Sequence, residues 1–278
     1  MGEEAAPAPA RPALSADLSD ALLALEDAGR LPMLDAVETG PWFSLEQTRA
    51  YRARLPRLPF HFHGAGLVEG AGFWPGQAAR IEAYRAAAGS PWVSLHISVW
   101  PPGWVRLAKT GRVRLPPLPP RLAVALFIRR VNALRAARRG TQPGVPLWLE
   151  NNEPLPLPGC AFEVEPAWIS HILAKTGCGL LLDGAHARVA AERLGLDLDD
   201  YLAGLPLERV CQLHVSGTRR RAGRLYDAHE TLTAADLDLA RRLLERTRPR
   251  VVTLEYIRGA EALAAQLAQF AELIQRAR

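Results

Sequence analysis

Histidines and carboxylates stand at the ends of the apolar segments of this chain. In GLLLDGAHARV (179–189), a run of leucines ends at Asp183, and His186 follows three positions later. Such a run is typical of a strand that is covered on both faces, as in a parallel sheet. A charge and an imidazole at its far end must be paired, bind something or lie in solvent. The meaning of this pair therefore depends on whether the chain repeats the arrangement.

The arrangement recurs along most of the chain. Six of the seven histidines lie at or just beyond an apolar segment, and only His171 lies within a helical pattern. The six are His61, His63, His96, His186, His214 and His229. The carboxylates that follow the same rule are Glu38, Glu150, Asp183, Asp227 and Glu255. Imidazoles and carboxylates without cysteine are typical ligands of iron, zinc or manganese, so the pattern predicts a metal site.

The number of candidate ligands exceeds what one ion can use, which indicates a site for two or more metals. Such a site needs a bridging carboxylate, and Glu150 is well placed to be one. Structural alternatives stay open for individual residues. Asp183 can simply cap the helix that follows it, and Asp227 and His229 can form a hydrogen-bonded pair within a loop.

Eight short apolar segments must position these residues. They are bounded by Gly, Pro or charge, and they alternate with helical patterns rich in Leu, Ala and Arg. The segments are 13–18, 33–38, 59–63, 92–97, 146–151, 179–184, 210–215 and 251–256. Eight strand-then-helix units predict an α/β fold, a single (β/α)8 TIM barrel with parallel strands. The carboxyl ends of all strands in such a barrel meet at one face, so we expect the metal site at that C-terminal face.

We expect the barrel to occupy residues 13–278 as one domain. The Pro/Ala-rich segment 1–12 lacks a secretory-signal pattern and predicts a disordered tail. A Pro-rich insertion at 100–120 is interpreted as a lid or substrate wall. Arg106 in this insertion and Arg219 are candidate contacts for an acidic peptide substrate, with solvated surface charge as the competing interpretation.

Composition argues against several function classes. No apolar run approaches the roughly 20 residues that span a bilayer, so we expect a cytoplasmic protein without a membrane partner. The formal charge is +5, but basic residues are interleaved with acidic ones, which argues against a nucleic-acid surface. Cys160, Cys178 and Cys211 have neither metal-type nor disulfide-type spacing, and we expect structural thiols.

A series of motifs carries a resemblance to a known family. The motifs are FHFHGAGL (60–67), VSLHIS (93–98), LWLENN (147–152), TGCGLLLD (176–183), DDYLAGLP (199–206), VCQLHVSGT (210–218), YDAHE (226–230) and TLEY (253–256). In this order and spacing the chain resembles domain-of-unknown-function family 692, the multinuclear non-haem iron-dependent oxidative enzymes, from about residue 13 to 258. The resemblance implies a barrel related to xylose isomerase and endonuclease IV. It also implies two or three iron ions (Fe2+/Fe3+), with dioxygen as co-substrate.

The family's ligands carry over to individual positions of this chain. The implied ligands are His63, His96, Glu150, Asp183, His214, Asp227, His229 and Glu255. His186 departs from the family pattern, which usually has Asn there. Because imidazole is a stronger ligand than an amide oxygen, His186 joins the candidate ligands, and the number and identity of the metals stay open.

The family modifies ribosomally synthesised peptides, often at cysteine. Many members work with a small partner protein that recognises the leader of the precursor peptide. The resemblance therefore implies an iron- and dioxygen-dependent oxidoreductase that acts on a precursor peptide, at Cys or a C-terminal residue, in natural-product maturation.

Specific roles follow for the candidate residues. Glu150, Asp183 and His186 are the candidate catalytic residues. Glu38, His61 and Asn151 are expected to support the ligands rather than bind metal, since residues behind a ligand fix its orientation. Zinc or manganese in place of iron stays open. The alternatives are a divalent-metal sugar isomerase or an endonuclease-IV-like hydrolase on the same barrel, or a non-catalytic metal-binding scaffold.

Overall fold

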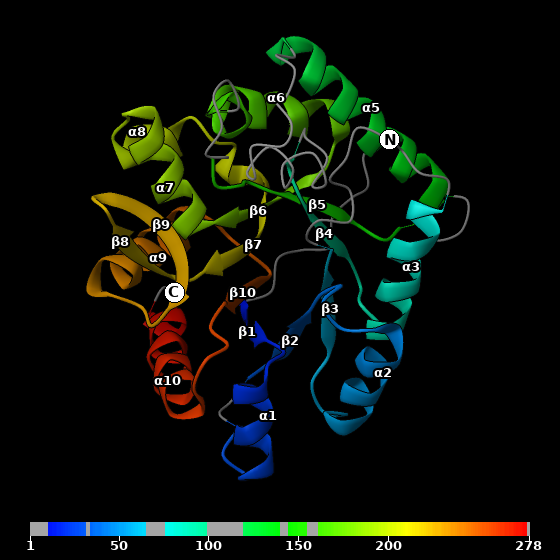
Figure 1. Cartoon of the computed structure of the whole chain (residues 1–278), viewed down its shortest axis with the longest axis vertical. Helices are drawn as coiled ribbons and strands as arrows, with labels where there is room; N and C mark the ends of the chain where they lie inside the picture. Colours follow the sequence, from blue (N-terminus) through cyan, green and yellow to red (C-terminus); the bar gives the residue numbers. More distant parts are fainter. Residues whose placement is uncertain are drawn as a thin grey trace.

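The computed structural model describes residues 11–31, 34–64, 76–98, 119–139, 144–154 and 161–276 (Figure 1). Most of the expected tail (1–12), most of the expected insertion (100–120), Arg106 and Cys160 lie outside these residues. The interpretations of those segments therefore stay predictions.

Eight parallel strands close into a barrel, which confirms the fold predicted from the sequence. In barrel order they are β1 (Ala13–Asp17), β10 (Val251–Leu254), β7 (Val210–Val215), β6 (Gly179–Asp183), β5 (Leu147–Glu150), β4 (Val93–His96), β3 (Phe60–His63) and β2 (Ala36–Thr39). Seven of the predicted apolar segments contain one of these strands, and the segment 33–38 overlaps β2, which ends one residue later at Thr39. Leu180, Leu181 and Leu182 of β6 are all fully buried, because one face of a barrel strand meets the interior and the other meets the helices.

Helices surround the barrel (Figure 1). They are α1 (Asp20–Asp27), α2 (Leu45–Arg54), α3 (Gln77–Ala88), α5 (Pro120–Arg139), α6 (Pro166–Thr176), α7 (Gly184–Leu194), α8 (Leu198–Ala203), α9 (Ala234–Arg246) and α10 (Ala260–Arg276), with short 3-10 turns η1 (Ala161–Val164) and η2 (Leu207–Arg209). In α9, Leu239 and Leu243 are buried, whereas Arg241 pairs with Glu245 on the exposed face. This helical spacing of apolar residues is what turns one face toward the barrel. None of the described helices is both long and apolar enough to cross a bilayer.

Local sequence signals set several helix ends. Ser44 and Gln47 form a capping box at the start of α2, in which each side chain accepts from the other residue's backbone N–H. Helix α6 ends at Gly177, whose φ of 66° is left-handed, a conformation that glycine adopts without steric cost.

A hairpin absent from the sequence analysis follows β7. Strands β8 (Gly217–Arg221) and β9 (Arg224–Glu230) pair antiparallel, and β9 packs against α7. The turn residues Ala222 and Gly223 have φ of 49° and 77°, and two positive φ values match the twist of a tight hairpin. Because the hairpin is mostly polar, it lacks the apolar pattern that reveals the barrel strands.

Candidate metal centre

Strand register brings the candidate ligands together at the carboxyl ends of the barrel strands, here called the barrel mouth. His63, His96, Glu150 and Asp183 are each the last residue of a strand. His96 lies beside Glu150 in the pairing of β4 with β5, and Asp183 lies beside His214 in the pairing of β6 with β7. Neighbouring strands therefore deliver an imidazole and a carboxylate side by side.

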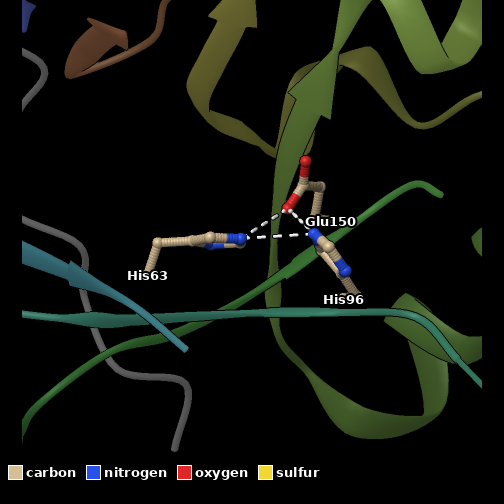
Figure 2. Close-up of side chains that lie close together, drawn as sticks. All are labelled: His63, His96 and Glu150. Carbon is tan, nitrogen blue, oxygen red and sulfur yellow. Dashed lines mark hydrogen bonds and ion pairs between the residues drawn. The ribbon is translucent and has the colours of Figure 1, made fainter. Parts of the chain in front are cut away.

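The first set of candidate ligands is His63, His96 and Glu150, which point toward one another in Figure 2. Glu150 Oε2 lies 3.2 Å from His63 Nε2 and 2.9 Å from His96 Nε2. Ser94 Oγ donates to the Phe62 carbonyl and lies 3.0 Å from His63 Nδ1, so the imidazole proton is placed on Nδ1. Burial lowers the pKa of His63 to about 4, although the charge of Glu150 acts to raise it. Its Nε2 therefore presents a lone pair to the set at neutral pH.

Glu150 reaches a second set through its other oxygen. Glu150 Oε1 lies 3.5 Å from His214 Nδ1 and 3.5 Å from His186 Nδ1. Ligand atoms of Glu150, Asp183 and His214 lie within 4.8 Å of one another. Glu255 Oε1 adds a contact of 3.0 Å to His214 Nδ1. One carboxylate thus faces two ligand sets with different oxygens, which is the geometry of a bridge between two ions.

The third set is Asp183, His186 and Asp227, again with ligand atoms within 4.8 Å of one another. His186 Nδ1 lies 2.9 Å from the carbonyl oxygen of Asn151. Since a carbonyl only accepts, Nδ1 carries a proton, and Nε2 lies 3.6 Å from Asp227 Oδ2. Burial opposes the charged form of His186, but the charges of Asp183 and Glu150 raise its pKa, so a cation bound here would displace a proton from Nε2. His229 Nε2 lies 3.0 Å from the same Asp227 oxygen.

Asp183 caps the following helix with one carboxylate oxygen and leaves the other unpaired. Its Oδ1 caps α7 by accepting the backbone N–H of His186 at 2.6 Å. Its Oδ2 is buried and has no hydrogen-bond partner among the described residues. Asn151 fixes the backbone of Asp183 through two hydrogen bonds, of 2.8 and 3.0 Å. The cap occupies only Oδ1. A buried carboxylate oxygen without a partner costs free energy, so Oδ2 is a candidate ligand for a cation.

Glu38 supports the ring of His214 from behind. Glu38 Oε2 accepts from His214 Nε2 at 3.0 Å and from Gln212 Nε2 at 2.6 Å, and it lies 3.1 Å from His61 Nδ1. With Nε2 paired to Glu38, His214 turns Nδ1 toward Glu150 and Glu255. Burial opposes the charged form of His214, but the charges of Glu38 and Glu255 raise its pKa, and a bound cation would displace the proton that they favour on Nδ1. A carboxylate behind a histidine in this way is typical of metal sites, because it fixes the ring and its tautomer.

Six carboxylates share the barrel mouth. They are Asp17, Glu38, Glu150, Asp183, Asp227 and Glu255, and all are at least nine-tenths buried by residue or side-chain exposure. Among the described residues, the ion pairs of these six involve histidine and neither lysine nor arginine. This donor set, rich in oxygen and imidazole nitrogen and without thiolate, fits iron, manganese or zinc.

Without metal, protons supply part of the missing positive charge. Burial raises the pKa of Asp183 to about 8, although the nearby His186 opposes the shift. Burial opposes the charged form of His229, but its hydrogen bond with Asp227 and the charge of Glu255 raise its pKa to about 10. Both groups therefore hold a proton at pH 7 that a bound cation would displace.

Asp17 lies at the barrel mouth although the sequence analysis assigned it no role. It is the last residue of β1 and lies beside Glu38 in the pairing of β1 with β2. In the sequence, Asp17 shows the same pattern as the other carboxylates, an acid at the end of an apolar segment. The segment is short and contains Ser15, which weakened the pattern.

Other predicted residues lie away from these ligand sets. Arg219 lies in β8, where its guanidinium donates to the Thr218 carbonyl and to the backbone and side chain of Thr231. Its contacts among the described residues therefore hold the hairpin together. Cys178 and Cys211 are free thiols near the opposite ends of β6 and β7 from the barrel mouth. Burial raises the pKa of both thiols, as expected for structural cysteines.

Comparison with protein families gives one match over most of the chain. The profile of a family described as RiPP precursor modification enzyme MbnB/TglH/ChrH matches residues 39–277. RiPPs are ribosomally synthesised and post-translationally modified peptides. Among curated proteins, a UPF0276 protein of Bordetella parapertussis is 37% identical over 136 residues, 45% of this chain and 46% of the relative. A UPF0276 protein of Rhizorhabdus wittichii is 41% identical over 63 residues, 23% of each chain. The aligned regions thus span less than half of these relatives.

Comparison with solved structures supports the barrel. A xylose isomerase domain protein from Alicyclobacillus acidocaldarius has a TM-score of 0.60 at 20% identity, over 96% of this chain and 99% of that one. An IolI protein with a bound zinc atom has a TM-score of 0.63 at 15% identity, with the same coverage. At these identities the likeness concerns the fold alone, which is that of the xylose-isomerase-like TIM barrels.

Proposed function

Because the chain belongs to the RiPP precursor modification enzymes of the MbnB/TglH/ChrH family, we propose that it is a multinuclear non-haem iron enzyme that uses dioxygen to oxidise a precursor peptide. The oxidised position is a cysteine or a C-terminal residue of the peptide. A small partner protein that recognises the leader of the precursor is the expected companion.

The observation that carries this proposal is the chain of three ligand sets linked by shared carboxylates. Glu150 belongs to the first and second sets, and Asp183 belongs to the second and third. Shared carboxylates hold neighbouring ions close together and offset their mutual repulsion. Residues from six different strands are ordered for this purpose at one end of the barrel, which no structural role of the single residues explains.

The residues have separable tasks in this proposal. His63, His96 and Glu150 hold one ion, Glu150, Asp183, His214 and Glu255 hold a second, and His186 and Asp227 hold a third with Asp183. Glu38 and Asn151 keep His214 and His186 in the tautomers that coordinate metal. Held by these residues, ferrous iron would supply the electrons that activate dioxygen for oxidation of the peptide. Arg106 and Arg219 stay as predicted contacts of an acidic peptide.

The proposal is tested with protein purified without oxygen and reconstituted with Fe2+. Metal content is measured by mass spectrometry, and oxygen consumption is followed with candidate precursor peptides that carry a cysteine. We expect at least two irons per chain, oxygen uptake that depends on the peptide, and a mass change in the peptide. Zinc in stoichiometric amount, with no iron bound and no oxygen consumed, would overturn the oxidase assignment and favour a hydrolase or isomerase.

A further inference from the structure

Asp17 is a buried acid that the three ligand sets leave unused. It is 7% exposed, and its Oδ1 is buried without a hydrogen-bond partner among the described residues. Two further buried carboxylates lie close to it: Glu38, its neighbour in the pairing of β1 with β2, and Glu255. No lysine or arginine among the described residues forms an ion pair with it. A buried carboxylate beside two others needs either a proton or a cation.

Two further side chains that can bind a metal, His229 and Glu255, lie close to Asp17. Ligand atoms of Asp17, His229 and Glu255 all lie within 4.8 Å of one another. Ligand atoms on opposite sides of an ion bonded at about 2.1 Å are about 4.2 Å apart, so only a small inward movement completes a coordination sphere. Asp17 comes from β1, His229 from β9 and Glu255 from the residue after β10, which are remote in sequence.

The backbone of His229 lies where the pairing of β8 with β9 shifts register, between the partners of Gly217 and Thr218. Its φ is 45°, a left-handed conformation that is uncommon for a residue other than glycine. Strain of this kind persists where the surrounding structure enforces it, and it is concentrated at functional sites. The imidazole of His229 contacts Asp227 at 3.0 Å and also has a ring nitrogen within 4.8 Å of carboxylate oxygens of Asp17 and Glu255.

We propose that Asp17, His229 and Glu255 form a fourth cation position at the barrel mouth, which binds a divalent metal such as Mn2+ or Fe2+. Two carboxylates and one imidazole are the ligand types that these ions accept. The position shares the carboxylate of Glu255 with the second set, since two oxygens can face two ions. A neutral imidazole has one lone pair, so His229 serves this position while Asp183, His186 and Asp227 remain to hold the third ion. The inference rests on the proposed metal centre, to which it adds a position that uses β1.

The test is a count of bound Mn2+ in metal-stripped protein. Free Mn2+ is followed by electron paramagnetic resonance during titration of the wild type, Asp17→Asn and the matched control Asp20→Asn. Asp20 is an exposed acid three positions from Asp17 and lies in α1. We expect Asp17→Asn to bind one Mn2+ fewer per chain than the wild type, and Asp20→Asn to bind the wild-type number. The replacement of Asp by Asn keeps the side-chain shape and removes a buried charge, so the variant should fold, which circular dichroism checks.

A second measurement locates the ion without any variant. Anomalous diffraction from wild-type crystals soaked in Mn2+ should show a peak bonded to Asp17. Equal Mn2+ numbers in the wild type and Asp17→Asn, or peaks at the other three sets alone, overturn this inference and leave the proposed function standing. Absence of any bound metal in the wild type overturns both.

Discussion

Replacing Glu150 with Gln probes the proposed bridge between the first and second ligand sets. Glu150 Oε2 serves His63 and His96 at 3.2 and 2.9 Å, and Oε1 faces His214 and His186 at 3.5 Å each. A Gln side chain has a single acceptor oxygen, and its amide N–H groups repel a cation, so it can serve one set at most. Glu150→Gln should therefore lose at least one ion per chain.

The same geometry sets an upper limit on the loss. The third set consists of Asp183, His186 and Asp227 and does not include Glu150, so the variant should lose no more than two ions per chain. Metal content after reconstitution with Fe2+ is measured by mass spectrometry, and peptide-dependent oxygen uptake should fall to background.

Glu153→Gln is the matched control, because Glu153 is exposed and lies three positions beyond Glu150. It should keep the wild-type metal content. Wild-type metal content in Glu150→Gln would refute the bridging role. Complete loss of metal from a folded Glu150→Gln variant would refute the independence of the third set.

Three further outcomes are expected. His186→Asn should bind one ion fewer at a given Fe2+ concentration, because an amide oxygen is a weaker ligand than the Nε2 lone pair; unchanged metal content would return His186 to a structural role. Metal affinity should rise at least about tenfold per pH unit between pH 6 and 8, because Asp183 and His229, with pKa values of about 8 and 10, must each lose a proton on binding. Calorimetry in buffers of different ionisation enthalpy measures the proton release. A metal affinity that does not change with pH would contradict this expectation. Glu38→Gln should weaken metal binding roughly 10- to 100-fold by releasing the ring of His214, with exposed Glu46→Gln as the control; equal affinities in the two variants would argue against the orienting role.

The barrel could be predicted from the sequence because its determinants are local. Each strand is a short apolar run bounded by Gly, Pro or charge, and runs such as Leu180–Leu182 are apolar on both faces because both faces are buried. Eight such runs separated by helical patterns leave few alternatives to a closed (β/α)8 barrel. The barrel architecture in turn places strand-end residues at one face, which is why the acids and histidines could be grouped before any distance was known.

The internal pairing at the barrel mouth depends on contacts that no local pattern encodes. Glu38 and His214 are 176 positions apart, and their contact depends on how the barrel closes. The hairpin β8–β9 carries Asp227 and His229 into the mouth, yet its mostly polar strands bury too little apolar surface to reveal themselves in sequence. Side-chain geometry likewise decides that Asp183 has one capping and one unpaired oxygen. It also decides that Asp17 approaches His229 and Glu255. Apolar periodicity records which surfaces are buried, whereas the positions of single polar atoms follow from the closed, packed barrel as a whole.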